Sequence, residues 1–291
     1  MQDEIRSIKI SVRNLVEFIM RSGDLDNTRT RNETDAMQAG SRMHRKLQKQ
    51  MGSNYSAEVP LSITVPVTRD DITFHLTVEG RADGIITNEV QENDFTLNLF
   101  EEKTEELPEI TIDEIKGVYM DLSLLKEPVK VHRAQVMCYA YIYAEKYDHT
   151  CIGTRLTYCN LESEDIKYFE EVFSYKELEL WFQELVEEYA KWAAWQITWT
   201  SSRDAMIKMV DFPFPYRKGQ NELVKGVYRT ILRKKKLFIE APTGVGKTIS
   251  TIFPSVKAMG EGLVERIFYL TAKTITRTVA EDTFRILREK G

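Results

Sequence analysis

Hydrophobic positions recur at two different periods along the first two hundred residues. Apolar residues three and four apart follow Ser11 over residues 12–19, which predicts a capped helix, and a second helix is expected near residues 34–51. The period then changes to two, which is the spacing of a half-buried strand. Strands are therefore expected over residues 57–67, 72–79, 81–87, 110–118 and 151–159, with a tyrosine-rich helix over 131–147 and a long acidic helix or helix pair over 166–199.

The last eighty residues have a different pattern. Pro213 and Pro215 mark a boundary, because proline and the residue before it are poorly compatible with continued helix. Beyond them, helices are expected over 219–233, 247–258 and 275–289, and short strands over 237–240 and 266–271. This order predicts a βαβ unit, so we expect two domains, residues 1–205 and 206–291.

The composition is that of an ordinary globular protein. Of the 291 residues, 42% are hydrophobic and 29% charged, and no apolar run approaches the roughly 20 residues that span a bilayer. The first residues lack the features of a signal peptide. The three cysteines show no CxxC spacing, so they indicate neither a disulfide framework nor a zinc knuckle. We therefore expect a cytoplasmic protein.

Charge is divided unevenly between the two expected domains. Residues 201–291 carry 18 Lys and Arg against 9 Asp and Glu, a net charge of +9. The remaining 22 basic and 36 acidic residues give residues 1–200 a net charge of −14. The second part is therefore better suited to a partner that carries phosphate.

A phosphate-binding loop is the sharpest motif of the chain. Residues 241–248 read APTGVGKT, which departs from GxxxxGK[ST] only at its first position. Glycines let successive backbone N–H groups face a phosphate, and the following helix adds its partial positive charge. Lys247 would reach the β and γ phosphates of magnesium-bound ATP, and the Thr248 hydroxyl would hold the magnesium. The expected ATP site comprises Thr243, Gly244, Val245, Gly246, Lys247 and Thr248.

The sequence around this loop resembles that of the superfamily 2 DNA helicases of the DinG/XPD group. The similarity rests on EAPTGVGKT, on YRKGQ at residues 216–220 and on YLTAKT at residues 269–274. It implies that Arg217 and Gln220 contact adenine. It also implies that single-stranded DNA backbone is bound by Thr271, Lys273 and Thr274.

The resemblance covers only about the last 80 residues. No Asp-Glu pair follows Lys247, and neither a second motor lobe nor a four-cysteine iron–sulfur segment is present in the sequence. Hydrolysis of ATP needs a further acidic group to hold the metal and to position water. We therefore expect a truncated helicase motor that binds nucleotide without unwinding DNA, the rest of the motor being missing.

Four short segments of the first domain indicate a second candidate site: GSRMH (40–44), GRADG (80–84), DEIK (113–116) and QVMCY (135–139). On a strand Glu114 and Lys116 share one face, roughly 6–7 Å apart, whereas Asp113 points to the other. Asp83 from a neighbouring strand and the Ile115 carbonyl would complete an oxygen-rich pocket for magnesium or manganese. Such an ion polarises a phosphate and acidifies its water, which Lys116 could orient.

This set resembles the PD-(D/E)XK nuclease superfamily, in the RecB-like branch that includes CRISPR-associated exonucleases, over roughly residues 10–200. The resemblance implies a restriction-endonuclease-like α/β fold, a mixed sheet flanked by helices. It adds His44 as a metal ligand and assigns Gln135 and Tyr139, which share a helix face, to DNA backbone or to Lys116. It implies metal-dependent hydrolysis of DNA, single-stranded or with free ends, in DNA repair or processing. No iron–sulfur cluster is expected in this chain.

Structural roles are open for every one of these residues. His44 could be a hydrogen-bonded core histidine, Glu114 and Lys116 an ion pair, Asp83 a turn residue, and Gln135 and Tyr139 packing residues. The basic stripe of α-helical residues 42, 45, 46 and 49 is expected to be a solvated face turned away from His44. The other histidines, His75, His132 and His149, have no partner at a useful spacing and receive no role.

Two rival functions follow from these alternatives. The first domain could be a degenerate nuclease that only docks DNA or a partner protein, or the phosphate loop could belong to an ATPase or kinase with the first domain as its substrate-binding part. The sequence leaves open the cleavage polarity, endo- or exonuclease action, DNA or RNA preference, and the oligomeric state.

Overall fold

A computed structural model describes residues 6–21, 33–88, 108–242, 244–272 and 274–290 of the chain. The chain forms two compact units, Met1–Ala194 (unit 1) and Trp195–Gly291 (unit 2). The boundary lies inside helix α4 (Tyr175–Met209), earlier than the expected one between residues 205 and 206. Because this helix runs through the boundary, no loop composition marks it in the sequence.

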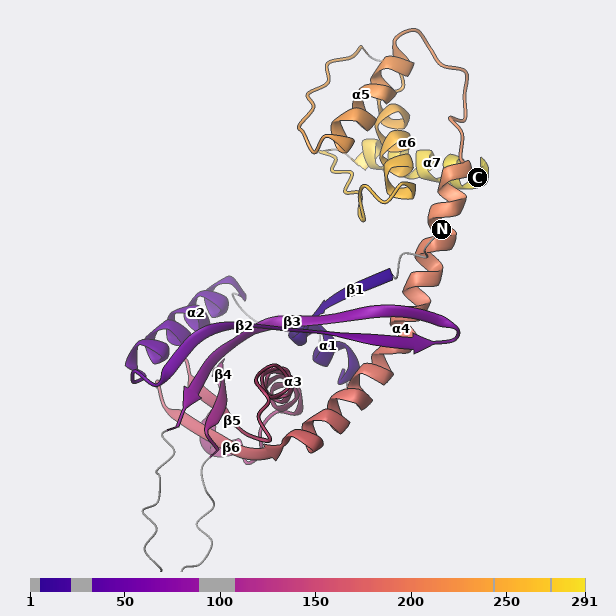
Figure 1. The fold of residues 1–291 in the computed structure, drawn as a ribbon. Coiled ribbons are helices and arrows are strands. Elements are labelled where there is room, and N and C mark those ends of the chain that lie inside the picture. Colours follow the sequence, from indigo (N-terminus) through magenta and orange to yellow (C-terminus); the bar gives the residue numbers. More distant parts are fainter. Residues whose placement is uncertain (1–5, 22–32, 89–107, 243, 273, 291) are drawn as a thin grey trace, which may run out of the picture. The chain divides into compact units, whose positions relative to one another are not determined.

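Unit 1 is an α/β domain built on a mixed six-stranded sheet (Figure 1). The strands lie in the order β1-β3-β4-β5-β6, and β2 pairs with β3 outside this path. The pairs β1–β3 and β4–β5 are parallel and the others antiparallel. The strands are β1 (Arg6–Ser11), β2 (Tyr55–Arg69), β3 (Ile72–Thr87), β4 (Ile110–Val118), β5 (Cys151–Asn160) and β6 (Ile166–Ser174).

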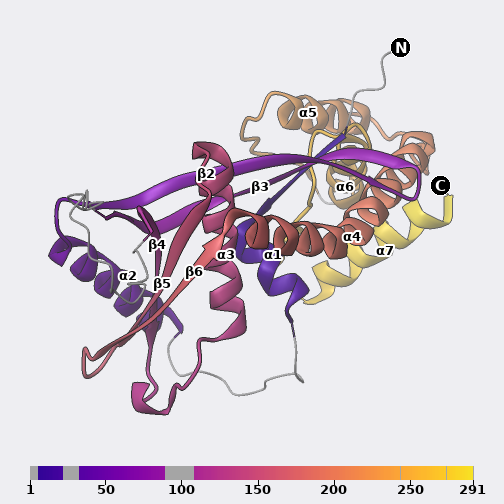
Figure 2. The same cartoon turned by 60° about the horizontal axis from the view of Figure 1, so that its bottom comes forward.

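Helices cover both faces of this sheet. Helix α3 (Lys130–Tyr147) lies inside the curve of the sheet, with α1 (Val12–Ile19) beside it (Figures 1 and 2). Phe18 of α1 meets Tyr189 and Trp192 of α4 edge to face, which ties α1 to the middle of α4. On the other face, helix α2 (Glu33–Gln50) packs two buried side chains, Met43 and Leu47, against β4 and β5.

The sheet opens at the middle of β3. One edge of β3 pairs with β2 along most of its length. The other edge pairs with β1 from Phe74 to Glu79 and with β4 from Gly84 to Thr87, so residues 80–83 have no strand partner there. The β2 ladder is also interrupted at Glu58, whose φ of 55° breaks the extended backbone. Asp83 therefore lies where β1 and β4 part from each other.

Most elements of unit 1 agree with the pattern of the sequence. The helices at 12–19, 34–51 and 131–147 and the strands at 57–67, 110–118 and 151–159 are confirmed, and Ser11 caps α1 by accepting from the Asn14 amide at 3.1 Å. The prediction of a turn at Gly80 is wrong, because residues 72–79 and 81–87 belong to one strand, β3. A helix starting at 166 was also wrong, since 166–174 is the edge strand β6, rich in aromatic and β-branched residues that suit a pleated surface. β1 was not predicted.

Unit 2 contains the end of α4 and the helices α5 (Gln220–Leu232), α6 (Lys247–Gly260) and α7 (Thr274–Lys290). Its core comprises Val210, Val224, Ile249, Ile252, Phe253, Ala280 and Leu287. The expected strands at 237–240 and 266–271 are wrong, because the described residues of unit 2 include no strand at all. A strand is stable only when a neighbour pairs with its backbone. Without one, Phe238 and Leu270 are 93% and 90% exposed.

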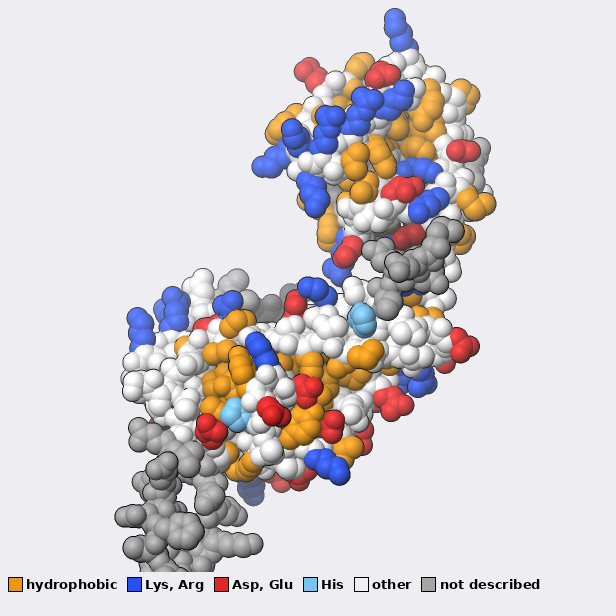
Figure 3. Space-filling view, in the orientation of Figure 1, with side chains coloured by type: hydrophobic (Ala, Val, Ile, Leu, Met, Phe, Trp, Pro, Cys, Tyr) orange, Lys and Arg blue, Asp and Glu red, His pale blue; other side chains and the backbone are white. Residues whose placement is uncertain are grey.

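Two surface properties complete the description. No helix in the described ranges combines the length and apolar character needed to cross a bilayer. Lys and Arg side chains form a band on the displayed face of unit 2, over and after α5 (Figure 3). Six basic residues between 225 and 236 are exposed, namely Lys225, Arg229, Arg233, Lys234, Lys235 and Lys236.

Candidate active site

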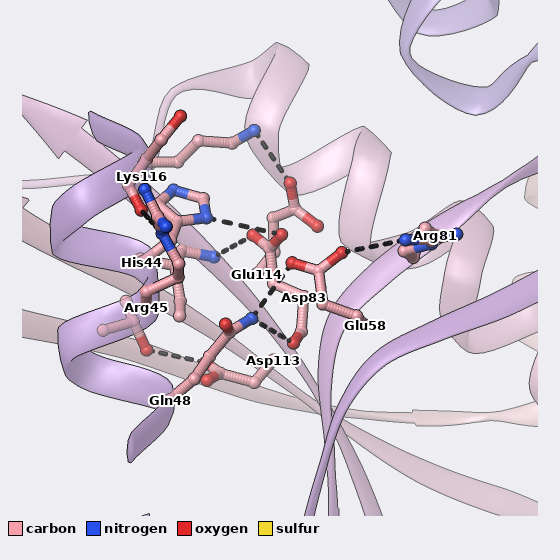
Figure 4. A network of polar contacts seen from close by, with 12 residues as sticks. His44, Arg45, Gln48, Glu58, Arg81, Asp83, Asp113, Glu114 and Lys116 are labelled. Atoms are coloured by element: carbon pink, nitrogen blue, oxygen red, sulfur yellow. Dashed lines mark hydrogen bonds and ion pairs between the residues drawn. The ribbon is translucent and has the colours of Figure 1, made fainter. Parts of the chain in front are cut away.

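Two carboxylates meet where β3 and β4 separate. Gly84 and Asp113 are the last paired residues there, so Asp83 and Glu114, the next residue of each strand, lie where the two strands part. The Asp83 carboxylate accepts a hydrogen bond from the Ile115 amide at 2.8 Å, and its other oxygen lies 3.5 Å from His44 Nδ1 (Figure 4). Helix α2 thus brings His44 to the acid of β3.

Glu114 is a buried acid with one free oxygen. It is 2% exposed, and its Oε1 accepts from Lys116 Nζ at 2.8 Å and from Gln135 Nε2 at 2.7 Å. Its Oε2 is the one buried side-chain nitrogen or oxygen of the described residues without a hydrogen-bond partner. Burial, reinforced by the negative charge of Asp83, raises the pKa of Glu114 to about 7. A cation beside Oε2 would remove this penalty.

Lys116 is held by two neighbours. Its Nζ donates to Glu114 and also to Gln135 Oε1 at 2.9 Å. An ammonium has three donors, so one N–H remains for a water or a phosphate oxygen. Because Gln135 bonds both Lys116 and Glu114, it fixes the geometry of the pair rather than facing substrate alone.

Tyr139 acts one turn further along α3. Its hydroxyl packs against Gly80 so closely that a Cβ there would lie 2.5 Å from the Tyr139 oxygen. Burial, and the charge of Glu114, raise the pKa of Tyr139, whereas hydrogen bonds to Gln135 and the Arg81 backbone oppose this. Tyr139 therefore lies between Gln135 and the gap in the sheet, next to Gly80.

The pKa of His44 lies above its ordinary value in this setting. Burial alone lowers its pKa, but the hydrogen bond to Asp83 and the charges of Asp83 and Glu114 outweigh that effect, and the net pKa is raised above 6.5. A metal ion would bind the neutral imidazole and release this proton.

Asp113 lies on the opposite face, as the strand period predicts. Its carboxylate is fully buried and accepts from Arg155 through two nitrogens at 3.0 Å, from Thr157 at 2.6 Å and from Tyr55 at 3.0 Å. Each of the two Asp113 carboxylate oxygens thus accepts two hydrogen bonds. Asp113 is a structural acid that joins β4, β5 and β2, and it does not face the site.

A cavity of about 590 Å³ lies beside these groups. His44, Lys116 and Gln135 line it, and so do residues outside the expected site, above all Arg13 of α1 and His132 of α3. Arg45 also lines it, so part of the basic stripe on α2 faces the same space as His44 and is not simply solvated. A single-helix wheel missed this because the wall is shared by three helices and the strands β2 and β4.

The side chains near the gap are of the kinds that bind a divalent cation, but their present positions do not bring them around one point. Within the described ranges, no three or more His, Cys, Asp and Glu side chains are positioned to hold a metal ion together. The reason is local, because Asp83 bonds Ile115 and His44 while Glu114 turns one oxygen toward Lys116. The unpartnered Glu114 Oε2 nevertheless fits a cation ligand. The Ile115 carbonyl fits as well, since N–H and C=O of one strand residue point to the same side.

The phosphate loop of unit 2 retains a defined local geometry. Gly244 and Gly246 have φ of 89° and 82°, which favours glycine at both positions. Gln220 is buried against Gly246, where a Cβ would lie 2.6 Å from its Nε2, and Arg217 donates to the Gly244 carbonyl. Lys247 Nζ lies over its own loop, donating to the carbonyls of residues 241 and 242 at 2.8 and 3.0 Å.

Arg217 and Gln220 therefore both contact the loop that precedes α6, and their expected contact with adenine stays a prediction. Val245 lies between the two loop glycines and Thr248 in the first turn of α6, whereas Thr271 precedes α7 and Thr274 is its first residue. Thr243 and Lys273 lie outside the described residues.

Comparisons with known proteins add little to this geometry. No family model matches the chain, and no curated protein matches it. Among solved structures, one described as "Crystal structure of SSO0001" is 16% identical, with a TM-score of 0.34 over 64% of this chain and 78% of that one. A likeness this remote carries no argument about function, and what is established for unit 1 is an α/β domain with a mixed six-stranded sheet flanked by helices.

Proposed function

We propose that unit 1 is a divalent-metal-dependent DNA nuclease of the PD-(D/E)XK type. The observation that carries this proposal is Glu114, a fully buried acid with an unpartnered oxygen, next to Asp83 on one side and Lys116 on the other. Leaving a buried acceptor unsatisfied costs about 1–3 kcal/mol, so such a group calls for a functional explanation. The cavity of about 590 Å³ beside it has room for a nucleotide.

In this proposal His44, Asp83, Glu114 and the Ile115 carbonyl hold magnesium or manganese. The ion supplies Lewis-acid polarisation of the scissile phosphate. Lys116 uses its remaining N–H to orient the attacking water or to stabilise charge on the phosphate. Gln135 holds Lys116 and Glu114 in register, and Tyr139 braces Gln135 against Gly80.

Cleavage of labelled single-stranded DNA in manganese tests the proposal. We expect degradation by the full chain and its loss, by more than a hundredfold, in Asp83→Ala and Lys116→Ala. Lys49→Ala and Glu162→Ala, which remove exposed charges elsewhere on unit 1, serve as matched controls. DNA that is retarded but never cut would instead support the rival function, a docking domain without catalysis.

We also propose that the loop of residues 241–248 in unit 2 binds the phosphates of ATP. The close packing of Gln220 against Gly246 supports this, because it brings the polar group expected near adenine to the glycine that shapes the loop. Hydrolysis and unwinding are not part of the proposal. Together with the band of basic side chains on this unit, the loop is consistent with a role in a DNA-processing protein.

A further inference from the structure

His132 lies in the same cavity wall as Lys116 and Gln135, one turn before Gln135 on α3. Its Nδ1 lies 2.9 Å from the hydroxyl of Tyr158, a side chain with no solvent exposure. The Tyr158 oxygen already accepts from the Val129 amide at 3.0 Å. Nothing in the proposed metal site uses His132.

This hydrogen bond determines which ring nitrogen carries the proton. A buried phenol needs an acceptor for its O–H, and His132 Nδ1 is the acceptor that the described residues provide. Nδ1 is therefore unprotonated, and the ring N–H is at Nε2. Since Tyr158 does not line the cavity whereas His132 does, Nε2–H is the polar group that the ring can offer to a molecule in the cavity.

The surroundings keep this donor uncharged. Burial, followed by the positive charges of Lys116 and Arg13, lowers the pKa of His132 to about 4, and only Glu17 opposes this. The titratable groups that act on the ring are Lys116 on β4, Tyr158 on β5, and Arg13 and Glu17 on α1. Three further ones, His44, Arg45 and Glu58, line the same cavity from α2 and β2. At neutral pH the ring is a neutral donor between two cations.

Arg13 supplies the second donor. Its Nε is paired with Glu17 at 2.6 Å, which leaves the terminal guanidinium nitrogens available. Arg13, His132 and Lys116 all line one cavity; the first two come from α1 and α3, whereas the expected metal ligands His44 and Asp83 come from α2 and β3. A neutral donor and a guanidinium fork directed at one space suit a phosphate oxygen.

We propose that Arg13 and His132 bind the phosphate next to the scissile one, so that the nucleic-acid strand leaves the metal pocket between α1 and α3. This inference rests on the proposed nuclease function of the same cavity. It assigns a substrate-binding role to two residues outside the expected catalytic set.

The test compares variants of the full chain on a fluorescent single-stranded oligonucleotide in manganese. We expect His132→Ala to raise KM roughly tenfold with kcat changed less than about twofold, as for a lost hydrogen bond to a charged group. His132→Gln, which keeps an amide donor, should recover most of the loss. His75→Ala, at a histidine of β3 outside this cavity, is the matched control and should leave KM unchanged.

Salt and pH separate binding from a purely structural role. Arg13→Gln should lower the slope of log affinity against log salt by about one, because it removes one charged phosphate contact, whereas His132→Ala should leave the slope unchanged. The His132→Ala effect should be the same at pH 6 and pH 8. An effect that grows at pH 6 would show a charged imidazole and overturn the proposal.

An unchanged KM in folded His132→Ala and Arg13→Gln proteins overturns the inference while leaving the nuclease intact. Where His132→Ala fails to fold, His132→Gln and Arg13→Gln decide the outcome in the same way. Wild-type protein that does not cleave DNA defeats the proposed function instead. In that case the variants and wild type are compared by their equilibrium affinity for the same oligonucleotide, measured by fluorescence anisotropy in EDTA. Equal affinities of variants and wild type overturn the proposed phosphate site.

Discussion

Replacing Glu114 by glutamine should change how the stability of unit 1 depends on pH. The acid is buried with a free oxygen, and its pKa lies at about 7 instead of the ordinary 4.5. Each step of one in pKa corresponds to about 1.4 kcal/mol, so ionising Glu114 in the folded protein costs roughly 3 kcal/mol. Glutamine keeps the shape and the acceptor for Lys116 but cannot ionise.

The direction follows from proton binding. Between pH 4.5 and 7 the folded protein holds the Glu114 proton more tightly than the unfolded chain does, so its stability falls as pH rises through this window. The penalty is absent below pH 4.5 and complete above pH 7. The unfolding free energy of wild type relative to Glu114→Gln should therefore decline by about 3 kcal/mol across the window and then level off.

Urea unfolding of the full chain in EDTA, followed through the transition of unit 1 from pH 4.5 to 8.5, measures this difference. Glu162→Gln, at an exposed acid, is the control and should track wild type. Adding manganese at pH 8 should stabilise wild type by about 2.7 kcal/mol at a hundred times its dissociation constant, and Glu114→Gln much less. Parallel pH profiles of wild type and Glu114→Gln would refute the assignment of Glu114 as a buried, unpaired acid.

Three further changes have defined outcomes. Asp113→Asn removes one partner of the buried pair with Arg155 and should lower the unfolding free energy by about 3–5 kcal/mol in thermal or urea unfolding. A smaller loss than for an exposed ion pair would contradict the structural role of Asp113. Gly80→Ala places a Cβ against the Tyr139 hydroxyl and should lower the DNA cleavage rate at least tenfold by displacing that brace; unchanged kinetics would argue against it. Lys247→Ala should weaken ATP binding at least tenfold in a fluorescent-nucleotide titration, and equal affinity would exclude the loop as the site.

Much of unit 1 was predictable because local periodicity determines it. Ser11 followed by helically spaced apolar residues specified α1, and the alternation at 110–118 specified β4 together with the face shared by Glu114 and Lys116. The same alternation placed Asp113 on the far face, where the structure has it bonded to Arg155. These features depend on neighbours within a few residues, and so they can be read from one sequence.

The expected strands of unit 2 show where local patterning fails. Residues 237–240 and 266–271 have the apolar character of buried strands, yet they are irregular in the structure and leave Phe238 exposed. A strand depends on hydrogen bonds to another segment, whereas a helix satisfies its own backbone. The helices α5, α6 and α7 were accordingly predicted close to their bounds, and the strands between them were not.

The sequence by itself determined which residue types could do chemistry and on which elements they lie. Only the tertiary structure decided how they meet: the parting of β1 and β4 beside Asp83, the free oxygen of Glu114, and the cavity wall that adds Arg13 and His132. The physical reason is that the spacing of hydrophobic residues shows only which face of a single helix or strand is buried. Hydrogen bonding, charge and burial at a site depend on side chains from segments far apart in the chain, and these are set when the elements pack.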